Sequence, residues 1–342
     1  MTTYAEKIAA QATKLAAETK AVNEAFLNYL DSDRVKEAAD AASEYTRVFM
    51  REESFMDKIM PPILVGNDEL DRQVDTDKPV IVVDKEPNSP AAISVPFGQL
   101  PVNRYIKGPR YRVLFERILS ARFTKDVDEL RTYDMDIRQV LSDNAIKDMA
   151  AEKDGKFIAL CDSSAVLGTA GYGTLTASDT GAGTAGDPAG LGSGSFRNYI
   201  MVDANGISRE TLIEMLKIMP ATASRLETQT VLCNNITIKD VLKFGRDEMG
   251  GDLAEEVLVN GWSERMFLGC RWIITIKRDI VPNSTFYLFT EPKFLGKHFL
   301  LEDTTMWIKK EAFLLEFFAY LTCGASIGNI NGVAKCVIQR TA

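Results

Sequence analysis

The chain has 342 residues, of which 46% are hydrophobic and 26% charged, and its formal net charge at pH 7 is -8. These values are typical of a folded protein with a sizeable core, and they exclude a wholly disordered chain. The negative balance disfavours a protein that grips nucleic acid, because such proteins concentrate Lys and Arg against the phosphates. The sequence also has no specific nucleic-acid-binding motif.

The first sixty residues carry apolar side chains at helical spacing. One run extends from Tyr4 to Leu30, Asp31-Ser32-Asp33 interrupts it, and a second run extends from Val35 to Phe49. Pro61-Pro62 ends the region. Because the apolar sides are rich in alanine, each helix buries little area alone and must dock on another surface.

Short β-prone runs follow, between about residues 78 and 118. PVIVVDK and AAISVPF are separated by the turn EPNSP, and NRYIKGPRYRVLFERILSARF predicts one or two further strands. Prolines at 79, 87, 90, 96, 101 and 109 keep this region out of a central sheet, since each removes a ladder donor. A hairpin of this kind is marginal by itself and needs a surface to lie on.

The next pattern predicts one long helix from about Thr124 to Lys153 and a strand at GKFIALC. After a glycine-rich stretch at 168–195 we expect helices at SRETLIEMLKIM and DLAEEVLVNG and strands at TQTVLCN, RWIITIK and TFYLFT. TMWIKKEAFLLEFFAYLTCG and GVAKCVIQR predict long terminal strands. The most apolar part of these strands is interrupted by Glu316 and is too short to span a bilayer comfortably, so no membrane is expected as a partner.

Three glycines of the glycine-rich stretch, Gly181, Gly183 and Gly186, have the spacing of a dinucleotide-binding loop. Such a loop must follow a buried strand and open directly into a helix, whose free amides hold the pyrophosphate. Here TLTASDT precedes the glycines and DPAG follows them, so the pattern favours a surface loop. A nucleotide-binding enzyme that uses this loop is the alternative from another class.

No catalytic, cofactor or metal site is predicted, and the chain is not expected to be an enzyme. A single histidine excludes HExxH zinc sites, and the neighbours of His298, Phe294 and Phe299, indicate a packed, hydrogen-bonded residue. The five cysteines are odd in number and never form a CxxC pair, which favours buried free thiols.

Charges of opposite sign are concentrated in separate stretches. The basic positions of the hairpin region are Arg104, Lys107, Arg110, Arg112 and Arg117. The acidic stretches NDELDRQVDTD (67–77) and DEMGGDLAEE (247–256) contribute Asn67 at the head of the first, Glu69, Asp71, Asp247, Glu248, Glu255 and Glu256. Either these side chains face water, or the basic hairpin lies over an acidic patch of the next subunit and helps to set its orientation. We treat them as candidate intersubunit contacts.

The most specific pattern lies in residues 261–339. A strand, the proline turn RDIVPNS, a second strand, the step Leu295-Gly296, an acidic stretch, aromatic strands and the ending GNINGVAKC follow one another. Together with the arm, the hairpin and the long helix, this order resembles the major capsid protein family of tailed bacteriophages. The resemblance implies the α+β phage major-capsid fold of the Hong Kong ninety-seven type.

By position, the resemblance implies an N-terminal helical arm (1–60) and an extended hairpin loop (78–118). It also implies a peripheral domain with a long spine helix (119–156 and 318–342) and an axial domain (157–317) with the glycine-rich loop 168–195. The implied function is self-assembly into pentamers and hexamers that form the icosahedral shell around a phage genome. That shell is the virion capsid, which assembles in the host cytoplasm.

The implied partners are further copies of the chain, a separate scaffolding protein, a portal and a decoration protein. The nearest rival interpretation is an encapsulin-type nanocompartment shell, which has the same fold and encloses cargo enzymes. The long helical arm and the proline-rich hairpin favour the phage protein over this rival.

Overall fold

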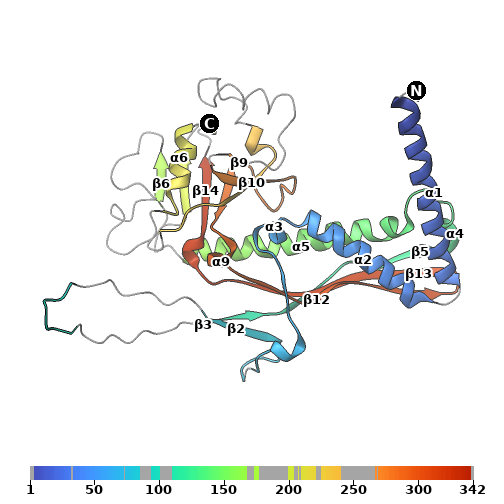
Figure 1. Ribbon diagram of the computed structural model, residues 1–342, viewed down its shortest axis with the longest axis horizontal. Helices are drawn as coiled ribbons and strands as arrows, with labels where there is room; N and C mark the ends of the chain where they lie inside the picture. The colour runs from blue at the N-terminus through green and yellow to red at the C-terminus, as the bar shows by residue number, and fades with distance from the viewer. Residues whose placement is uncertain are drawn as a thin grey trace.

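The computed structural model describes residues 4–31, 34–72, 74–84, 94–100, 110–167, 173–176, 199–203, 207, 209–220, 225–239, 266–267 and 269–339. Two sheets and a two-stranded ribbon hold most of these residues (Figure 1). The helices are α1 (Tyr4–Asp31), α2 (Val35–Glu53), α3 (Phe55–Ile59), α4 (Val127–Leu130), α5 (Ile137–Leu167), α6 (Arg209–Lys217) and α9 (Pro292–Leu295), with short 3-10 turns η1 (Asn67–Glu69) and η3 (Ile330–Gly332).

The first sheet has five strands in the order β1-β12-β13-β4, and β5 also pairs with β13. Its strands are β1 (Ile63–Leu64), β4 (Glu116–Leu119), β5 (Phe123–Asp126), β12 (Gly296–Glu311) and β13 (Leu314–Ile327). The β12–β13 hairpin confirms the long terminal strands that the sequence predicts. Alternate residues of β13, from Leu315 to Leu321, are buried beneath α2 and α5, since side chains of a strand point to opposite faces in turn.

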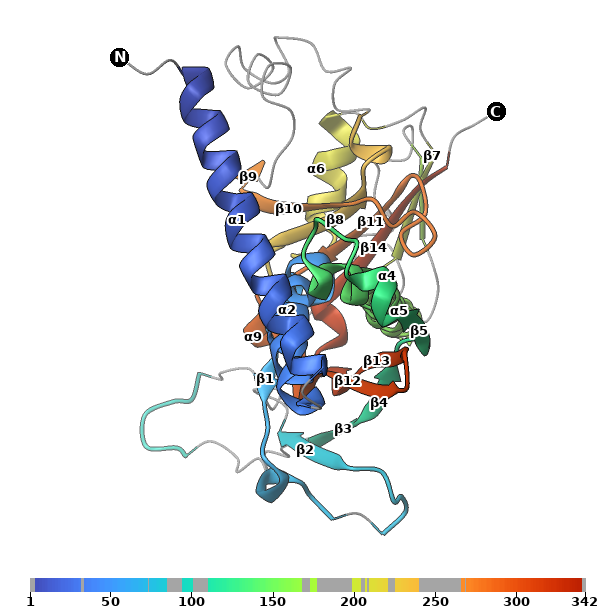
Figure 2. The same ribbon diagram turned by 90° about the vertical axis from the view of Figure 1, so that its right-hand side faces the viewer.

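The second sheet has seven strands in the order β6-β7-β14-β11-β8-β10-β9. They are β6 (Gly173–Thr176), β7 (Tyr199–Asp203), β8 (Thr230–Asn234), β9 (Met266–Phe267), β10 (Cys270–Thr275), β11 (Thr285–Phe289) and β14 (Val333–Gln339). α6 packs its apolar side against Trp272 and Phe286 on one face, whereas Phe157 of α5 and α3 cover the other. Figures 1 and 2 show the two sheets on opposite sides of α5.

The long helix differs from the sequence prediction at both ends. Residues 123–126 form β5 rather than helix, α4 is a single turn capped by the Asp126 carboxylate, and α5 begins only at Ile137. The strand expected at 155–161 is wrong, because α5 continues through it to Leu167. Phe157, Ile158 and Cys161 lie on one helical face and are all buried, so packing overrides the β preference of these side chains.

The described part of the first sixty residues forms the expected helices, with α1 ending at Asp31 and α2 beginning at Val35. In the second half of α1, Phe26 and Leu30 are buried against the body, whereas Leu15 is 65% exposed. The Asn23 side chain fixes this packing, because it accepts a hydrogen bond from Ile137 N (3.0 Å) at the start of α5 and donates to Met135 O (2.8 Å). The N-terminal half of α1 projects from the body as an arm (Figure 1).

The expected domain ranges and the observed sheets divide the chain differently. Position 317/318 falls inside β13, and β14 returns to the seven-stranded sheet between β7 and β11. The helix expected at DLAEEVLVNG and the glycines Gly181, Gly183 and Gly186 lie outside the described residues. The division into peripheral and axial domains therefore stays a prediction.

Candidate assembly surfaces

The hairpin region forms an antiparallel ribbon of β2 (Val80–Asp84) and β3 (Arg110–Leu114), in which Val80 pairs with Leu114 and Asp84 with Arg110. The ribbon belongs to neither large sheet, as its prolines predict. Its base rests on a small core of Val65, Val113, Phe115 and Phe299. Beyond this core the ribbon carries the chain away from both sheets (Figure 1).

The acidic segment, residues 67–77, lies against this ribbon within the same chain. Asp71 binds the ribbon edge twice: its N–H donates to Val80 O (2.9 Å), and its carboxylate accepts from Val82 N (2.7 Å). Arg112 pairs with Asp75 of the segment, and the hydrogen bond from this guanidinium holds the pKa of the Asp75 carboxyl below its usual value. Exposed ion pairs of this kind contribute little stability.

The residues predicted as intersubunit contacts lie in several different parts of the structure. Arg110 pairs with Asp84 across the ribbon (2.8 Å), and both side chains are largely exposed. Asn67 and Glu69 lie exposed in η1. The remaining predicted contacts, Arg104, Lys107, Asp247, Glu248, Glu255 and Glu256, lie outside the described residues. An intersubunit role for all of these positions stays a prediction.

Arg117 lies on the five-stranded sheet, on the face opposite α2 and α5. Its guanidinium is 5.5 Å from the ring centroid of Tyr320 and 3.5 Å from the Glu302 carboxylate. Tyr320, Phe318 and Trp307 form a row of aromatic rings on this face. The ring centroids of Tyr320 and Phe318 are 6.1 Å apart, and those of Phe318 and Trp307 are 5.0 Å apart. This surface combines aromatic rings with arginine, a composition enriched where proteins bind one another.

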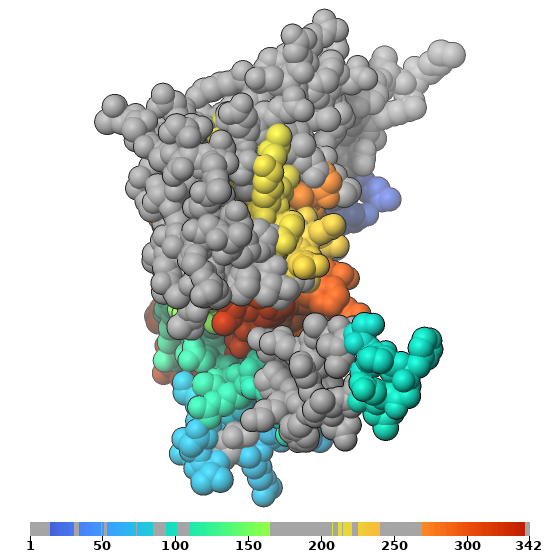
Figure 3. Space-filling model, turned by 90° about the vertical axis from the view of Figure 1, so that its left-hand side faces the viewer, coloured from blue at the N-terminus to red at the C-terminus, as the bar shows by residue number. Residues whose placement is uncertain are grey.

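The tip, residues 94–100, overlaps the strand that the sequence predicts at AAISVPF. That prediction is wrong for the described residues 94–97, which form no strand because Pro96 cannot donate to a ladder and a turn follows at Phe97-Gly98. Every one of its residues is exposed, and Phe97 and Leu100 are 109% and 92% exposed. Gly98 has φ +86°, a left-handed conformation that favours glycine and tightens the turn. In Figures 1 and 3 the tip stands out from the body. Its signal was an apolar, uncharged run, SVPFGQL, between prolines.

A buried cluster of polar side chains, called the joint below, connects α3 and the preceding Ser54 to α5. The Asp154 carboxylate of α5, which is fully buried, accepts hydrogen bonds from Ser54 Oγ (2.8 Å), Met56 N (3.1 Å) and Lys277 Nζ (2.7 Å). One residue earlier, Lys153 forms a buried ion pair with Asp57 of α3 (2.5 Å). Two adjacent residues of α5 thus hold α3 with charges of opposite sign.

His298 closes this joint from β12, and the sequence prediction of a packed, hydrogen-bonded residue is confirmed. Its Nδ1 lies 3.3 Å from Met60 O and 3.4 Å from Asp57 Oδ1. Burial, aided by the nearby Lys153 charge, lowers the pKa of His298 to about 3, so the ring is neutral. Within the described residues its Nε2 has no hydrogen-bond partner.

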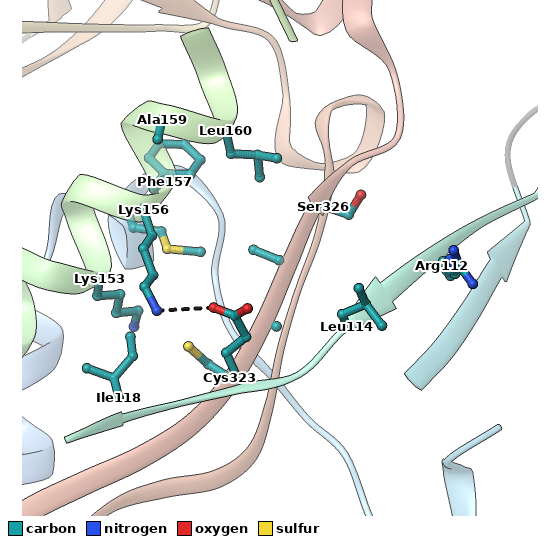
Figure 4. Close-up of a pocket in the computed structure, with 14 residues that line it drawn as sticks. Arg112, Leu114, Ile118, Lys153, Lys156, Phe157, Ala159, Leu160, Cys323 and Ser326 are labelled. Carbon is teal, nitrogen blue, oxygen red and sulfur yellow. Dashed lines mark hydrogen bonds and ion pairs between the residues drawn. The ribbon is translucent and has the colours of Figure 1, made fainter. Parts of the chain in front are cut away.

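A pocket of about 370 Å³ opens between α5 and the base of the ribbon (Figure 4). Leu114 of β3 and Ile118 of β4 line one side of the pocket, and Phe157 and Leu160 of α5 line the other. The pocket lies where the chain changes its partner strand, because β3 pairs with β2 whereas β4, which follows it, pairs with β13. Gly324 permits the crossing, since a Cβ there would lie 2.7 Å from Leu114 O.

The cysteines are free, as predicted: Cys161, Cys233, Cys270 and Cys336 are buried, and Cys323 is partly buried on the pocket wall. Among the described residues, no group of three or more His, Cys, Asp or Glu side chains is placed to hold a metal ion. No helix in the described ranges is both long and apolar enough to cross a membrane.

Comparison with known proteins identifies the fold. No protein-family model matches the chain, and no curated protein matches it. Among solved structures, the bacteriophage PhiM1 mature capsid aligns with a TM-score of 0.52 and 10% identity, over 84% of this chain and 88% of that one. Mycobacterium phage Adephagia gives 0.52 and 8%, over 84% and 91%. A virus-like particle from Pyrococcus furiosus gives 0.50 and 10%, over 88% and 99%.

These similarities cover most of both chains and show the fold class. The chain has the mixed α+β fold of phage capsid proteins, the Hong Kong ninety-seven type. The fold that the C-terminal sequence pattern predicts is confirmed.

Proposed function

We propose that the chain is a major capsid protein that self-assembles into pentamers and hexamers, which join as the icosahedral shell around a phage genome. The observation that carries the proposal is the fold together with two projections that have no surface of their own to rest on. The N-terminal half of α1 and the tip both leave the body, and they expose Leu15 in α1 and Phe97 and Leu100 in the tip. A monomer rarely exposes such segments without a partner.

Ring closure follows from contacts between different surfaces of neighbouring copies. A head-to-tail contact closes a ring when its rotation divides the circle, and otherwise it continues as a filament or sheet. Each contact can be weak, because a subunit held by several neighbours binds each of them at high effective concentration. Arg110 of the ribbon lies beside Asp84 but is 70% exposed, so it remains accessible to a neighbouring copy and orients this contact.

The resulting particle is a virion shell, built in the host cytoplasm. A separate scaffolding protein, a portal and a decoration protein are its expected partners, and no catalytic role is assigned to the chain. The similarity to the Pyrococcus furiosus virus-like particle favours one second candidate, a nanocompartment shell of the encapsulin type. The two candidates differ in content: nucleic acid in the first, a cargo enzyme in the second.

Electron microscopy of the protein, expressed alone and together with its neighbouring genes, tests the proposal. Closed shells that contain nuclease-protected DNA after expression with those genes support the phage capsid. Shells that hold a co-expressed enzyme support the compartment. A particle that stays small at every concentration and with every neighbouring gene product contradicts both.

A charge reversal tests the role of the ribbon. Arg110 is 70% exposed, so Arg110→Glu should leave folding intact and weaken assembly. The matched control is Arg131→Glu, because Arg131 is also exposed and its partner Asp128 lies three residues earlier in the same turn. Equal assembly of both variants would remove the ribbon charge from the contact.

A further inference from the structure

The outer edge of β10 is only partly covered by the described strands. β10 lies between β8 and β9 in the seven-stranded sheet, but β9 pairs only with Cys270 and Arg271 (Figure 1). Further along, residues 273–275 pair with β8 alone among the described strands. A strand edge of this kind presents N–H and C=O groups that can bind a further strand.

The direction of these backbone groups follows from the pairing with β8. Arg271 N donates to Gln229 O (2.7 Å), and Thr275 O accepts from Asn235 N (3.0 Å), so the odd-numbered residues of β10 bind the β8 side. Successive residues of a strand point these groups in opposite directions. The N–H and C=O of Ile274 therefore point away from β8, toward the open edge.

A groove beside this edge leaves room for a further strand. Its described lining consists of Glu53, Phe55, Lys58 and residues 273–277, and its volume is about 340 Å³. This site is called the edge groove below. Ile276, one of its lining residues, is 79% exposed. Natural proteins usually avoid an exposed apolar side chain next to an open strand edge, because it invites pairing with another chain.

The two faces of the sheet set which side chains an added strand needs at this edge. Ile274 packs on the cluster of apolar side chains beneath α6, whereas Ile273 packs with Phe55 of α3. Because side chains of a strand alternate between faces, every second residue of an added strand lies beside Ile274. The residues between them face the edge groove. Apolar side chains suit the first set.

The charge of the second side is positive. Lys58 lines the edge groove, and the exposed Arg271 lies on the same face of β10. Glu53 also lines the groove, and the charge of Lys277 is already balanced by the buried Asp154 carboxylate (2.7 Å). Two cations thus stand against one carboxylate, and this balance favours acidic side chains in the occupant.

We propose that the edge of β10 at Ile274 binds an extended peptide segment of a partner protein, in which apolar and acidic residues alternate. The segment adds a strand by exchanging backbone hydrogen bonds with Ile274 and sets its acidic side chains in the edge groove. Within the described residues, neither the tip nor the acidic segment fits. The tip is uncharged, and Asp71 already binds the acidic segment to the ribbon. We therefore assign the occupant to a different protein, which goes beyond the proposed function.

Amide hydrogen exchange of the unassembled chain, resolved by residue, tests the open edge first. Because the N–H groups of Ile273 and Thr275 point at β8, they should exchange slowly, and Ile274 N–H should exchange at least about 10-fold faster. The probe is a blocked octapeptide of alternating valine and glutamate. Its addition should slow exchange at Ile274 by at least about 10-fold and leave Ile273 unchanged.

A matched pair of variants tests the side-chain contacts. Ile276→Asp should weaken binding of the fluorescently labelled octapeptide by at least about 10-fold, since it replaces the apolar neighbour with a charge of the same sign as the peptide. Val74→Asp is the control: Val74 is also a fully exposed apolar residue, but it lies in the acidic segment, and binding should be unchanged. The same octapeptide with lysine in place of glutamate should bind at least about 10-fold more weakly.

The outcomes separate the inference from the proposed function. Slowed exchange at Ile274 together with weaker binding to Ile276→Asp supports the peptide site. Exchange of Ile274 as slow as that of Ile273 in the free chain overturns it, as does a lack of peptide binding or equal binding of an octapeptide with methylated backbone nitrogens. Slowed exchange of Ile274 on assembly of the chain alone overturns the partner protein and gives the edge to a second copy. None of these results depends on shell formation, so the capsid function is tested separately by electron microscopy.

Discussion

Among the described residues, Asp154 should be the charged position most sensitive to substitution. Its fully buried carboxylate accepts from four donors: Ser54 Oγ, Met56 N, Lys277 Nζ and, at 3.4 Å, Phe55 N. Replacement by alanine leaves the Lys277 ammonium, which is 16% exposed, without its carboxylate, and it removes the acceptor of Ser54 Oγ and Met56 N. Loss of the charged hydrogen bond costs about 1.5–3 kcal/mol, and each neutral bond about 0.5–1.5. We therefore expect Asp154→Ala to lower the free energy of unfolding by about 3–5 kcal/mol, the range for a broken buried pair.

The assay is urea unfolding of the unassembled chain, followed by circular dichroism, with proteolysis of the arm as a local probe. Glu152→Ala is the matched control: Glu152 also lies on α5 and also pairs with a lysine, Lys156 (3.8 Å), but its side chain is 61% exposed. That change should cost about 0–1 kcal/mol, because solvent screens the pair. Equal, small losses of unfolding free energy from both variants would show that burial does not strengthen the bonds to Asp154.

Three further predictions concern stability and reactivity. Because the pKa of His298 falls from 6.5 to about 3 on folding, its stabilising effect is complete above pH 6.5 and is lost as the pH falls from 6.5 toward 3. His298→Gln should therefore lose about 2–3 kcal/mol less than the unmodified chain between pH 7 and 4.5, as measured by urea titration, and parallel losses would contradict this. In β13, Leu315→Ala should cost about 2–5 kcal/mol because Leu315 is completely buried, whereas Leu314→Ala, at 39% exposure, should cost about 1 kcal/mol or less; similar thermal midpoints would argue against the assigned face. Burial raises the pKa of Cys233 and Cys336 to about 12, so a thiol reagent should leave both unmodified in the native chain and modify all five cysteines in urea; rapid native labelling of either would contradict the core.

Local pattern was sufficient for elements whose neighbours in sequence are also their partners in space. The arm helices, the β12–β13 hairpin and the separate ribbon all follow from periodicity and proline positions. It failed at residues 155–161, where β-prone side chains form a buried helical face because two sheets pack on α5. The return of β14 to the seven-stranded sheet is also set by long-range pairing, with β11 and β7, which no local pattern encodes.

The candidate surfaces were only partly predictable. Charge pattern indicated the basic ribbon and the acidic segment but not that Arg112 and Asp75 of the same chain pair. The joint escaped detection, because Asp154 and Lys277 are separated by 123 residues and carry no motif. The pocket lies where β3 pairs with β2 and the following strand β4 pairs with β13, and this change of partner is set by the fold and by no local pattern.

Native mass spectrometry of the purified chain, at rising protein concentration, tests the central claim most directly. We expect masses of five and six times 37.9 kDa, followed by closed particles built from those rings. A monomer or dimer that persists unchanged at every concentration, and with every co-expressed neighbour, would contradict it.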